Sequence, residues 1–145
     1  MDKEQGASVR WVAMPDDATI PDSHRDLLEA PDVAVLSTLG ADGRPQSTAV
    51  WYLLDGDVVR ASLVTTRQKY RNMARHPHAT LFVLDPANPY RSIEVRADVT
   101  IEDDPDLALL ERVVTHYGSD LATFPGEKEG RVVVTLTPRR VVANG

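Results

Sequence analysis

Apolar and polar residues along the chain follow spacings that predict mostly β-strands. Residues 33–39 form a nearly unbroken apolar run with β-branched side chains, which is too short for a buried helix and favours a buried strand. Further strands are predicted over residues 46–54, 58–63, 78–84, 92–102 and 132–137, with 141–143 as a candidate short strand. The dipeptide Asp55-Gly56 separates two of them and predicts a tight hairpin turn. Most of the sheet is therefore expected to be antiparallel.

Three segments have the apolar spacing of short helices. They are residues 21–30, which precede Pro31, about 67–76, which precede Pro77, and 103–117, which precede Gly118. About six antiparallel strands and three short helices in one small domain favour a β-barrel with peripheral helices, since closure removes exposed strand edges. The barrel is expected to span residues 20–145, and a sizeable ligand would lie in a groove completed by a second subunit.

Residues 1–19 are predicted to form an extended N-terminal arm. The segment is mostly polar but contains Trp11, a large apolar side chain. Trp11 is compatible both with an arm that packs on the body or on a second subunit and with a floppy chain end.

The composition of the chain excludes several classes of site and partner. Its 145 residues carry a net charge of -6, which argues against a nucleic-acid partner. The absence of cysteine excludes disulfides, thiolate metal sites and cysteine nucleophiles. No apolar run is long enough to cross a membrane and no signal peptide is recognisable, so a cytoplasmic location is expected. The four histidines form no recognised ligand set, so no metal site is expected.

A local positive field stands out in this acidic chain. Between Asp57 and Asp85 there is no Asp or Glu. The same segment carries Arg60, Arg67, Lys69, Arg71 and Arg75, and Ser62, Thr65 and Thr66 precede the predicted helix. Hydroxyl groups, free backbone N–H groups and the positive end of a helix dipole would together suit a phosphate. The same residues also fit a simpler interpretation, in which Thr66 is an N-cap and the basic residues form a solvated face.

Three motifs carry a resemblance to a known family. In order along the chain they are GRPQSTAVWY, SLVTTRQKYRNMARHPHATL and DPANPYRSIEVRA. The chain resembles the split β-barrel flavin-binding proteins related to pyridoxamine 5'-phosphate oxidase. It is more closely similar to the actinobacterial branch of that superfamily, which uses the deazaflavin coenzyme F420. Unlike the pyridoxine oxidases, the sequence shows no basic C-terminal segment for a substrate phosphate, so vitamin B6 oxidation is not expected.

The resemblance implies a cofactor site, a partner and an activity. The phosphate would be held by Ser62, Thr65, Thr66, Arg67 and Lys69. The ring and ribityl chain would lie along Gln46, Ser47, Thr48, Ala49, Val50 and Trp51. Relatives are homodimers with both cofactors at the subunit interface, so Tyr90, Arg91 and Ser92 are candidates to complete the site from the partner. From its position in the predicted strand, Trp51 either stacks on the ring or simply fills the barrel.

Three functions follow from this resemblance. The first is hydride transfer between reduced F420 and an organic small molecule, with Tyr52, Tyr90 or His116 as candidate proton donors and no residue singled out as catalytic. The second is an FMN-binding oxidoreductase of the same fold. Binding of F420's charged tail would distinguish the first from the second, and Arg44, Arg71 or Arg75 are candidates for it. The third is a protein that carries F420, a flavin or a tetrapyrrole without turnover.

Overall fold

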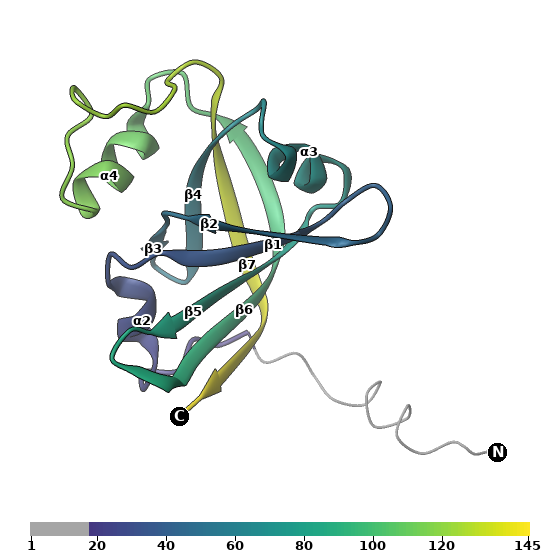
Figure 1. Ribbon diagram of the computed structural model, residues 1–145, viewed down its shortest axis with the longest axis vertical. Helices are drawn as coiled ribbons and strands as arrows, with labels where there is room; N and C mark the ends of the chain where they lie inside the picture. Colours follow the sequence, from purple (N-terminus) through teal and green to yellow (C-terminus); the bar gives the residue numbers. More distant parts are fainter. Residues whose placement is uncertain (1–17) are drawn as a thin grey trace.

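The computed structural model describes residues 18–145, and its strands form one antiparallel sheet (Figure 1). The strands are β1 (Ala34–Leu39), β2 (Pro45–Val50), β3 (Leu53–Asp55), β4 (Val58–Val64), β5 (His78–Asp85), β6 (Asn88–Asp103) and β7 (Arg131–Asn144). The helices are α2 (Arg25–Glu29), α3 (Gln68–Arg75) and α4 (Ala108–His116). The predicted fold class, mainly β with short peripheral helices, is confirmed. Trp11 and most of the predicted arm lie outside the described residues.

The order of the strands explains how the sheet curls into a split barrel. The order is β2-β1-β5-β6-β7-β4-β3, so β2 and β3 are the two edges although only Trp51 and Tyr52 separate them in the chain. A single strand was predicted over residues 46–54, and this prediction was wrong because the chain crosses between the edges at Tyr52. The Tyr52 side chain is fully buried there, and its hydroxyl donates to the Leu27 carbonyl at 3.0 Å.

One long strand replaces the two that were predicted at the C-terminal end. β7 continues through Pro138, which pairs with Ala97, while Arg96 pairs with Arg140. The intervening Arg139 is therefore an extra residue in a β-bulge. Proline has no N–H to donate, and a bulge is one of the few places where a paired strand tolerates it. The Thr-Pro-Arg-Arg sequence marks a bulge in this strand and does not end it.

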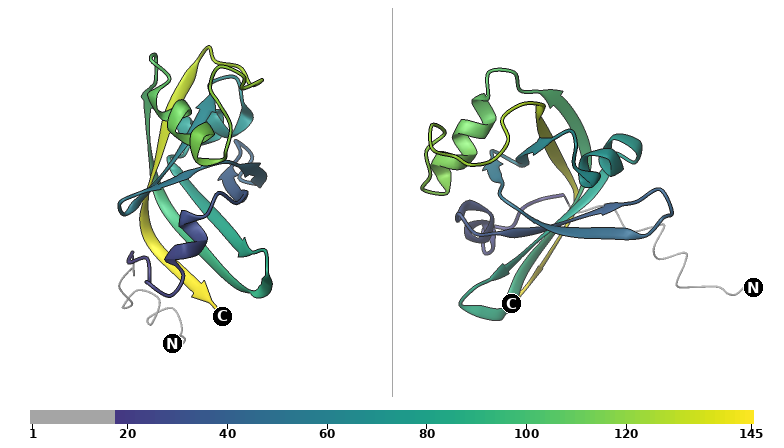
Figure 2. Two further views of the ribbon diagram at one scale, coloured as in Figure 1. Left: turned by 90° about the vertical axis from the view of Figure 1, so that its left-hand side faces the viewer. Right: turned by 45° about the horizontal axis from the view of Figure 1, so that its top comes forward.

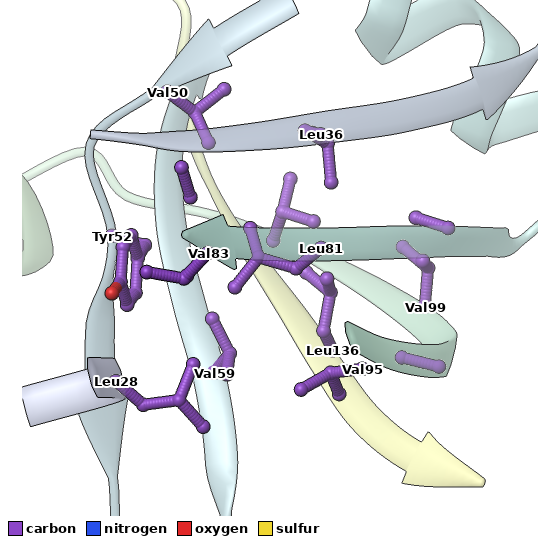
Figure 3. Close-up of a cluster of buried hydrophobic side chains, with 14 of the residues drawn as sticks. Leu28, Leu36, Val50, Tyr52, Val59, Leu81, Val83, Val95, Val99 and Leu136 are labelled. Atoms are coloured by element: carbon purple, nitrogen blue, oxygen red, sulfur yellow. The ribbon is translucent and has the colours of Figure 1, made fainter. Parts of the chain in front are cut away.

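The inner face of the curled sheet holds the main hydrophobic core. Figure 3 shows Tyr52 and Leu28 packed against side chains of β4 and β5, among them Val59 and Val83. A smaller cluster lies under α4, where Leu109 and Val113 contact strand residues. The described part of the chain contains no helix that is long and apolar enough to cross a membrane.

Helix α3 is attached to the sheet through a buried amide. Asn72 is only 1% exposed, and its Nδ2 donates to Thr38 Oγ1 at 3.0 Å and to Gln46 Oε1 at 3.2 Å. Its Oδ1 accepts a hydrogen bond of 2.8 Å from Gln68 Nε2. The helix is thereby held against β1 and β2, with Met73 buried beside Asn72. The predicted helix limits agree with these bounds to within one residue.

Helix α4 begins later than predicted. The strand β6 runs through Asp103, and Leu107 adopts a left-handed conformation with φ of 60° before the helix starts. The buried carboxylate of Asp104 accepts hydrogen bonds from the backbone N–H groups of Ala108 and Leu109 at 3.0 and 3.1 Å. Asp104 therefore caps the helix as expected, but from a position beyond the usual N-cap.

Candidate functional site

A groove of about 320 Å³ opens at the end of the barrel that carries α3 and α4. These helices lie on either side of β4 in Figure 1, and the two views of Figure 2 keep them at the same end. Residues of β2, β4, β7, α3, α4, the β2–β3 crossing and the segment after α4 line the groove, together with Val33 before β1 and the N-cap of α3. The lining residues are Val33, Ala49, Val50, Trp51, Ser62, Leu63, Val64, Arg67, Lys69, Leu110, Val113, Val114, Phe124 and Arg131.

Three cationic side chains, those of Arg67, Lys69 and Arg131, form a basic cluster in the groove. Burial lowers the pKa of Lys69, and the nearby charge of Arg67 lowers it further. Burial and then the charge of Arg67 also lower the pKa of Arg131, and the charge of Glu127, which lies outside the groove lining, opposes this shift. None of the described lining residues carries a carboxylate, so these charges repel one another without a counter-charge from the groove wall. This arrangement suits an anion.

The start of α3 adds backbone donors to the basic cluster. Arg67 is the N-cap, and no side chain caps the helix. The first intrahelical hydrogen bond joins the Arg71 N–H to the Arg67 carbonyl, so the N–H groups of Gln68 and Lys69 have no acceptor within the helix. The first turn also contains no acidic residue. The interpretation of Thr66 as the N-cap was therefore wrong, and within residues 18–145 no side chain caps the positive end of this helix.

Arg131 was not identified from the sequence. Its Nε donates to the Glu127 carbonyl at 2.7 Å and its Nη1 to the Ser62 carbonyl at 3.3 Å. The guanidinium also lies 5.5 Å from the centre of the Phe124 ring. Arg131 reaches the groove because it pairs with Val64 in the β4–β7 register, just before the turn that leads into α3. Only the register of two distant strands could have revealed this residue.

The rest of the groove wall is apolar and aromatic. Helix α4 contributes Leu110, Val113 and Val114, and the segment after it contributes Phe124. Trp51 also lines the groove, and its indole stacks on the Tyr117 ring with centroids 4.5 Å apart and planes 5° apart. The groove therefore offers positive charge together with a large apolar surface.

The structure brings six of the predicted cofactor-binding residues to this groove. They are Ala49, Val50, Trp51, Ser62, Arg67 and Lys69. Thr48 does not line it, but its hydroxyl accepts a hydrogen bond of 3.1 Å from Lys69 Nζ.

The other predicted residues near the groove have partners within the chain. The Gln46 amide is bonded to Asn72, and the Ser47 hydroxyl lies 2.8 Å from that of Ser37. The Thr65 N–H donates to the Gly130 carbonyl at 3.1 Å, which joins the turn before α3 to the segment before β7. The Thr66 carbonyl accepts a hydrogen bond from Arg71. The assignment of these residues to a cofactor stays a prediction.

Tyr90 and Arg91 do not reach the groove of their own chain. They belong to the start of β6, and the β5–β6 turn lies at the opposite end of the barrel from α3 and α4 (Figure 1). The Arg91 guanidinium forms ion pairs with Asp26 and Asp85, while the Tyr90 side chain is 84% exposed. Their contribution from a partner subunit, together with that of Ser92, stays a prediction.

The groove contains few groups for acid–base or metal chemistry. Its only charged side chains among the described residues are the three cations, and Tyr52, Tyr90 and His116 do not line it. Burial also raises the pKa of Tyr52 far above its ordinary value. Within residues 18–145 no group of three metal-ligating side chains was found. None of the described lining residues is His, Cys, Met or Tyr, the side chains that usually ligate haem iron.

Comparisons with known proteins agree with this fold. The family described as pyridoxamine 5'-phosphate oxidase matches residues 20–144. An F420 reductase from Mycobacterium smegmatis is 38% identical, with a TM-score of 0.79 over 85% of this chain and 98% of that chain. No match was found among curated protein sequences.

More distant solved structures share the fold alone. A conserved hypothetical protein from Mycobacterium tuberculosis is 21% identical, with a TM-score of 0.68 over 90% of this chain and 89% of its own. A heme binding protein from Mycobacterium smegmatis is 20% identical, with a TM-score of 0.66 over 88% of this chain and 55% of its own.

Proposed function

The chain belongs to the pyridoxamine 5'-phosphate oxidase family, and from this premise we propose that it is an F420-dependent oxidoreductase. It would transfer a hydride between reduced coenzyme F420 and an organic small molecule. The 38% identity to an F420 reductase over nearly all of that chain supports the choice of cofactor within the family.

The observation that carries the proposal is a single groove with both basic and apolar walls. The cluster of Arg67, Lys69 and Arg131 carries positive charge, and none of the described lining residues supplies a carboxylate to it. The N–H groups at the start of α3 add to this positive charge. Trp51 and the α4 residues provide the apolar surface that a planar tricyclic ring needs. A ligand that has a phosphate joined to an aromatic ring fits this combination of residues.

Each part of the groove has a defined task in this proposal. Lys69 and Arg67 would hold the phosphate, and Arg131 would add a third positive charge beside Ser62. Trp51 would contact the ring, and α4 would exclude water from it. The cofactor would supply the hydride chemistry when bound. Because no carboxylate or histidine is among the described lining residues, we assign the proton for the acceptor to water.

FMN binding is the second candidate, because two of the residues predicted to hold the F420 tail have other partners. Arg71 donates to the Thr66 carbonyl at 2.9 Å and to Gln68 Oε1 at 2.8 Å, and Arg44 lies 3.8 Å from the Asp42 carboxylate. Arg75 is exposed and remains a candidate for the tail. A non-catalytic carrier is the third candidate, since the described lining residues include no carboxylate, histidine or tyrosine. Haem has less support, because the described lining includes no usual axial ligand.

A homodimer is part of the proposal. The outer faces of β1 and β5 expose Val35, Leu39, Phe82 and Leu84, each between 38% and 45% exposed, and Val35 pairs directly with Phe82. Val33, next to β1, is 58% exposed and also lines the groove. A second copy that covers this apolar face would therefore border the groove and could complete the site.

Equilibrium titration of the purified protein with F420 and separately with FMN tests the choice of cofactor. Binding is followed by tryptophan fluorescence at two salt concentrations. We expect tighter, salt-sensitive binding of F420, because its charged tail adds ionic contacts. A preference for FMN would move the protein to the second candidate, and binding of neither would contradict the proposal. If F420 binds, hydride transfer to a panel of acceptors then separates a reductase from a carrier.

A further inference from the structure

The aromatic pair of Trp51 and Tyr117 joins the strand crossing to the end of α4. Trp51 is the first residue of the crossing between β2 and β3, and Tyr117 directly follows α4. Their rings are nearly parallel, with centroids 4.5 Å apart. Two segments far apart in the chain are thus joined beside the groove.

The hydroxyl of Tyr117 ties its ring both to the crossing and to the segment before β1. It accepts a hydrogen bond of 3.1 Å from the Tyr52 N–H and donates one of 2.8 Å to the Asp32 carbonyl. Burial raises the pKa of Tyr117 to about 12, so the hydroxyl stays protonated and able to donate at neutral pH. The Tyr117 ring therefore has a fixed position relative to the backbone next to Trp51.

Only one face of the Trp51 indole is covered by this contact. Trp51 is 37% exposed and lines the groove, whereas Tyr117 is not among the described lining residues. Tyr117 therefore stacks on the indole from outside the groove. A ligand ring in the groove would meet the indole from the side away from Tyr117, and aromatic rings favour such offset or stacked contacts.

We propose that Tyr117 is a positioning residue that locks Trp51 as a one-sided stacking platform for the ring of the bound cofactor. The inference rests on the proposed function for the identity of the ring. The locking of Trp51 by Tyr117 is a property of the chain itself and can be measured without a ligand.

The first measurement uses the ligand-free protein in a Trp11→Phe background, in which Trp51 is the only tryptophan. Near-ultraviolet circular dichroism then reports how well the Trp51 indole is ordered. Tyr117→Leu removes the stacked ring and both hydrogen bonds, whereas Tyr117→Phe keeps the ring. We expect the Trp51 signal to be lost in Tyr117→Leu and reduced to a smaller extent in Tyr117→Phe, which keeps the stacked ring but loses both hydrogen bonds. An unchanged signal in Tyr117→Leu would overturn the positioning role, whatever the cofactor.

The second measurement compares a ligand that has a ring with one that has none. We expect Tyr117→Leu to bind FMN about tenfold more weakly, the upper range for one aromatic contact, and Tyr117→Phe to show a smaller loss of affinity because it keeps the ring. Binding of inorganic phosphate, followed by its protection against thermal unfolding, should be the same in all three proteins. Equal loss of FMN and phosphate binding in Tyr117→Leu would indicate that the whole groove is disturbed, and it would overturn the proposed role of Tyr117 in positioning Trp51 for a ring. If the wild-type protein binds neither F420 nor FMN, the proposed function is contradicted. The circular dichroism result would then still test whether Tyr117 orders Trp51, but a cofactor ring would no longer be its target.

Discussion

The ammonium group of Lys69 donates a hydrogen bond of 3.1 Å to the hydroxyl of Thr48, which joins the first turn of α3 to β2. This neutral hydroxyl is the only hydrogen-bond partner of the Lys69 ammonium within residues 18–145, and its charged neighbour, Arg67, repels it. A half-buried lysine in these surroundings is poorly compensated unless an anion is bound. Lys69 is therefore the residue on which the phosphate site can be tested most directly.

Lys69→Ala is expected to bind FMN and F420 at least about tenfold more weakly, because it removes a charged hydrogen bond to the phosphate. The fold should be intact, as judged by the far-ultraviolet circular dichroism spectrum. Lys128→Ala is the matched control, since Lys128 is an exposed lysine outside the groove. Equal affinities of wild type and Lys69→Ala would rule out the phosphate role.

We expect the charged Lys69 to lower the free energy of unfolding of the ligand-free protein at neutral pH. Its pKa in the folded protein lies below the ordinary value of 10.5, so between these two values the unfolded chain binds more protons than the folded one. The contribution of Lys69 to the free energy of unfolding is therefore lowest below its pKa in the folded protein, and it rises as the pH increases toward 10.5. We expect Lys69→Met to be at least as stable as wild type at pH 7 in urea unfolding. As the pH is raised, the free energy of unfolding of the wild type should increase relative to that of Lys69→Met. The opposite trend would contradict the lowered pKa of Lys69.

Asn72→Leu should destabilise the protein by about 1 to 3 kcal/mol, because the buried Thr38 hydroxyl loses its donor and the Gln46 and Gln68 amides lose a partner. The measurement is the free energy of unfolding in urea. Arg75→Ala, on the exposed side of the same helix, should change it by less than about 0.5 kcal/mol. A similar small effect of Asn72→Leu would mean that this amide does not hold α3 on the sheet.

Phe82→Arg is expected to convert the proposed homodimer to monomers, because it places a charge at the centre of the apolar face of β1 and β5. Thr100→Arg, at an exposed position of β6, should leave the dimer intact. Analytical ultracentrifugation of the three proteins gives their masses. A monomeric wild-type protein would contradict the proposed interface.

The elements that were predicted well are those with local causes. The Asp55-Gly56 turn has Gly56 at φ of 64°, a conformation that glycine adopts without a steric penalty. Helix α3 is bounded by its own apolar spacing and by Pro77, so its limits were visible in a short stretch of sequence. Two members of the basic cluster, Arg67 and Lys69, were visible for the same reason, since they lie two residues apart in the chain.

The errors occurred where distant segments decide the local structure. The break at Tyr52 depends on the Leu27 carbonyl and on Tyr117, which are 25 and 65 residues away. The continuity of β7 past Pro138 depends on its pairing with β6. Neither contact leaves a signal in the sequence next to the residue that it affects.

The sequence by itself determined the mainly β class, the hairpin at Asp55-Gly56 and the positive charge around α3, because turn geometry, residue spacing and charge act between neighbours along the chain. Only the tertiary structure decided that Arg131 joins Arg67 and Lys69, and that Tyr117 stacks on Trp51. These contacts depend on the register of β4 with β7 and on the packing of α4, which are set by burial summed over the whole fold.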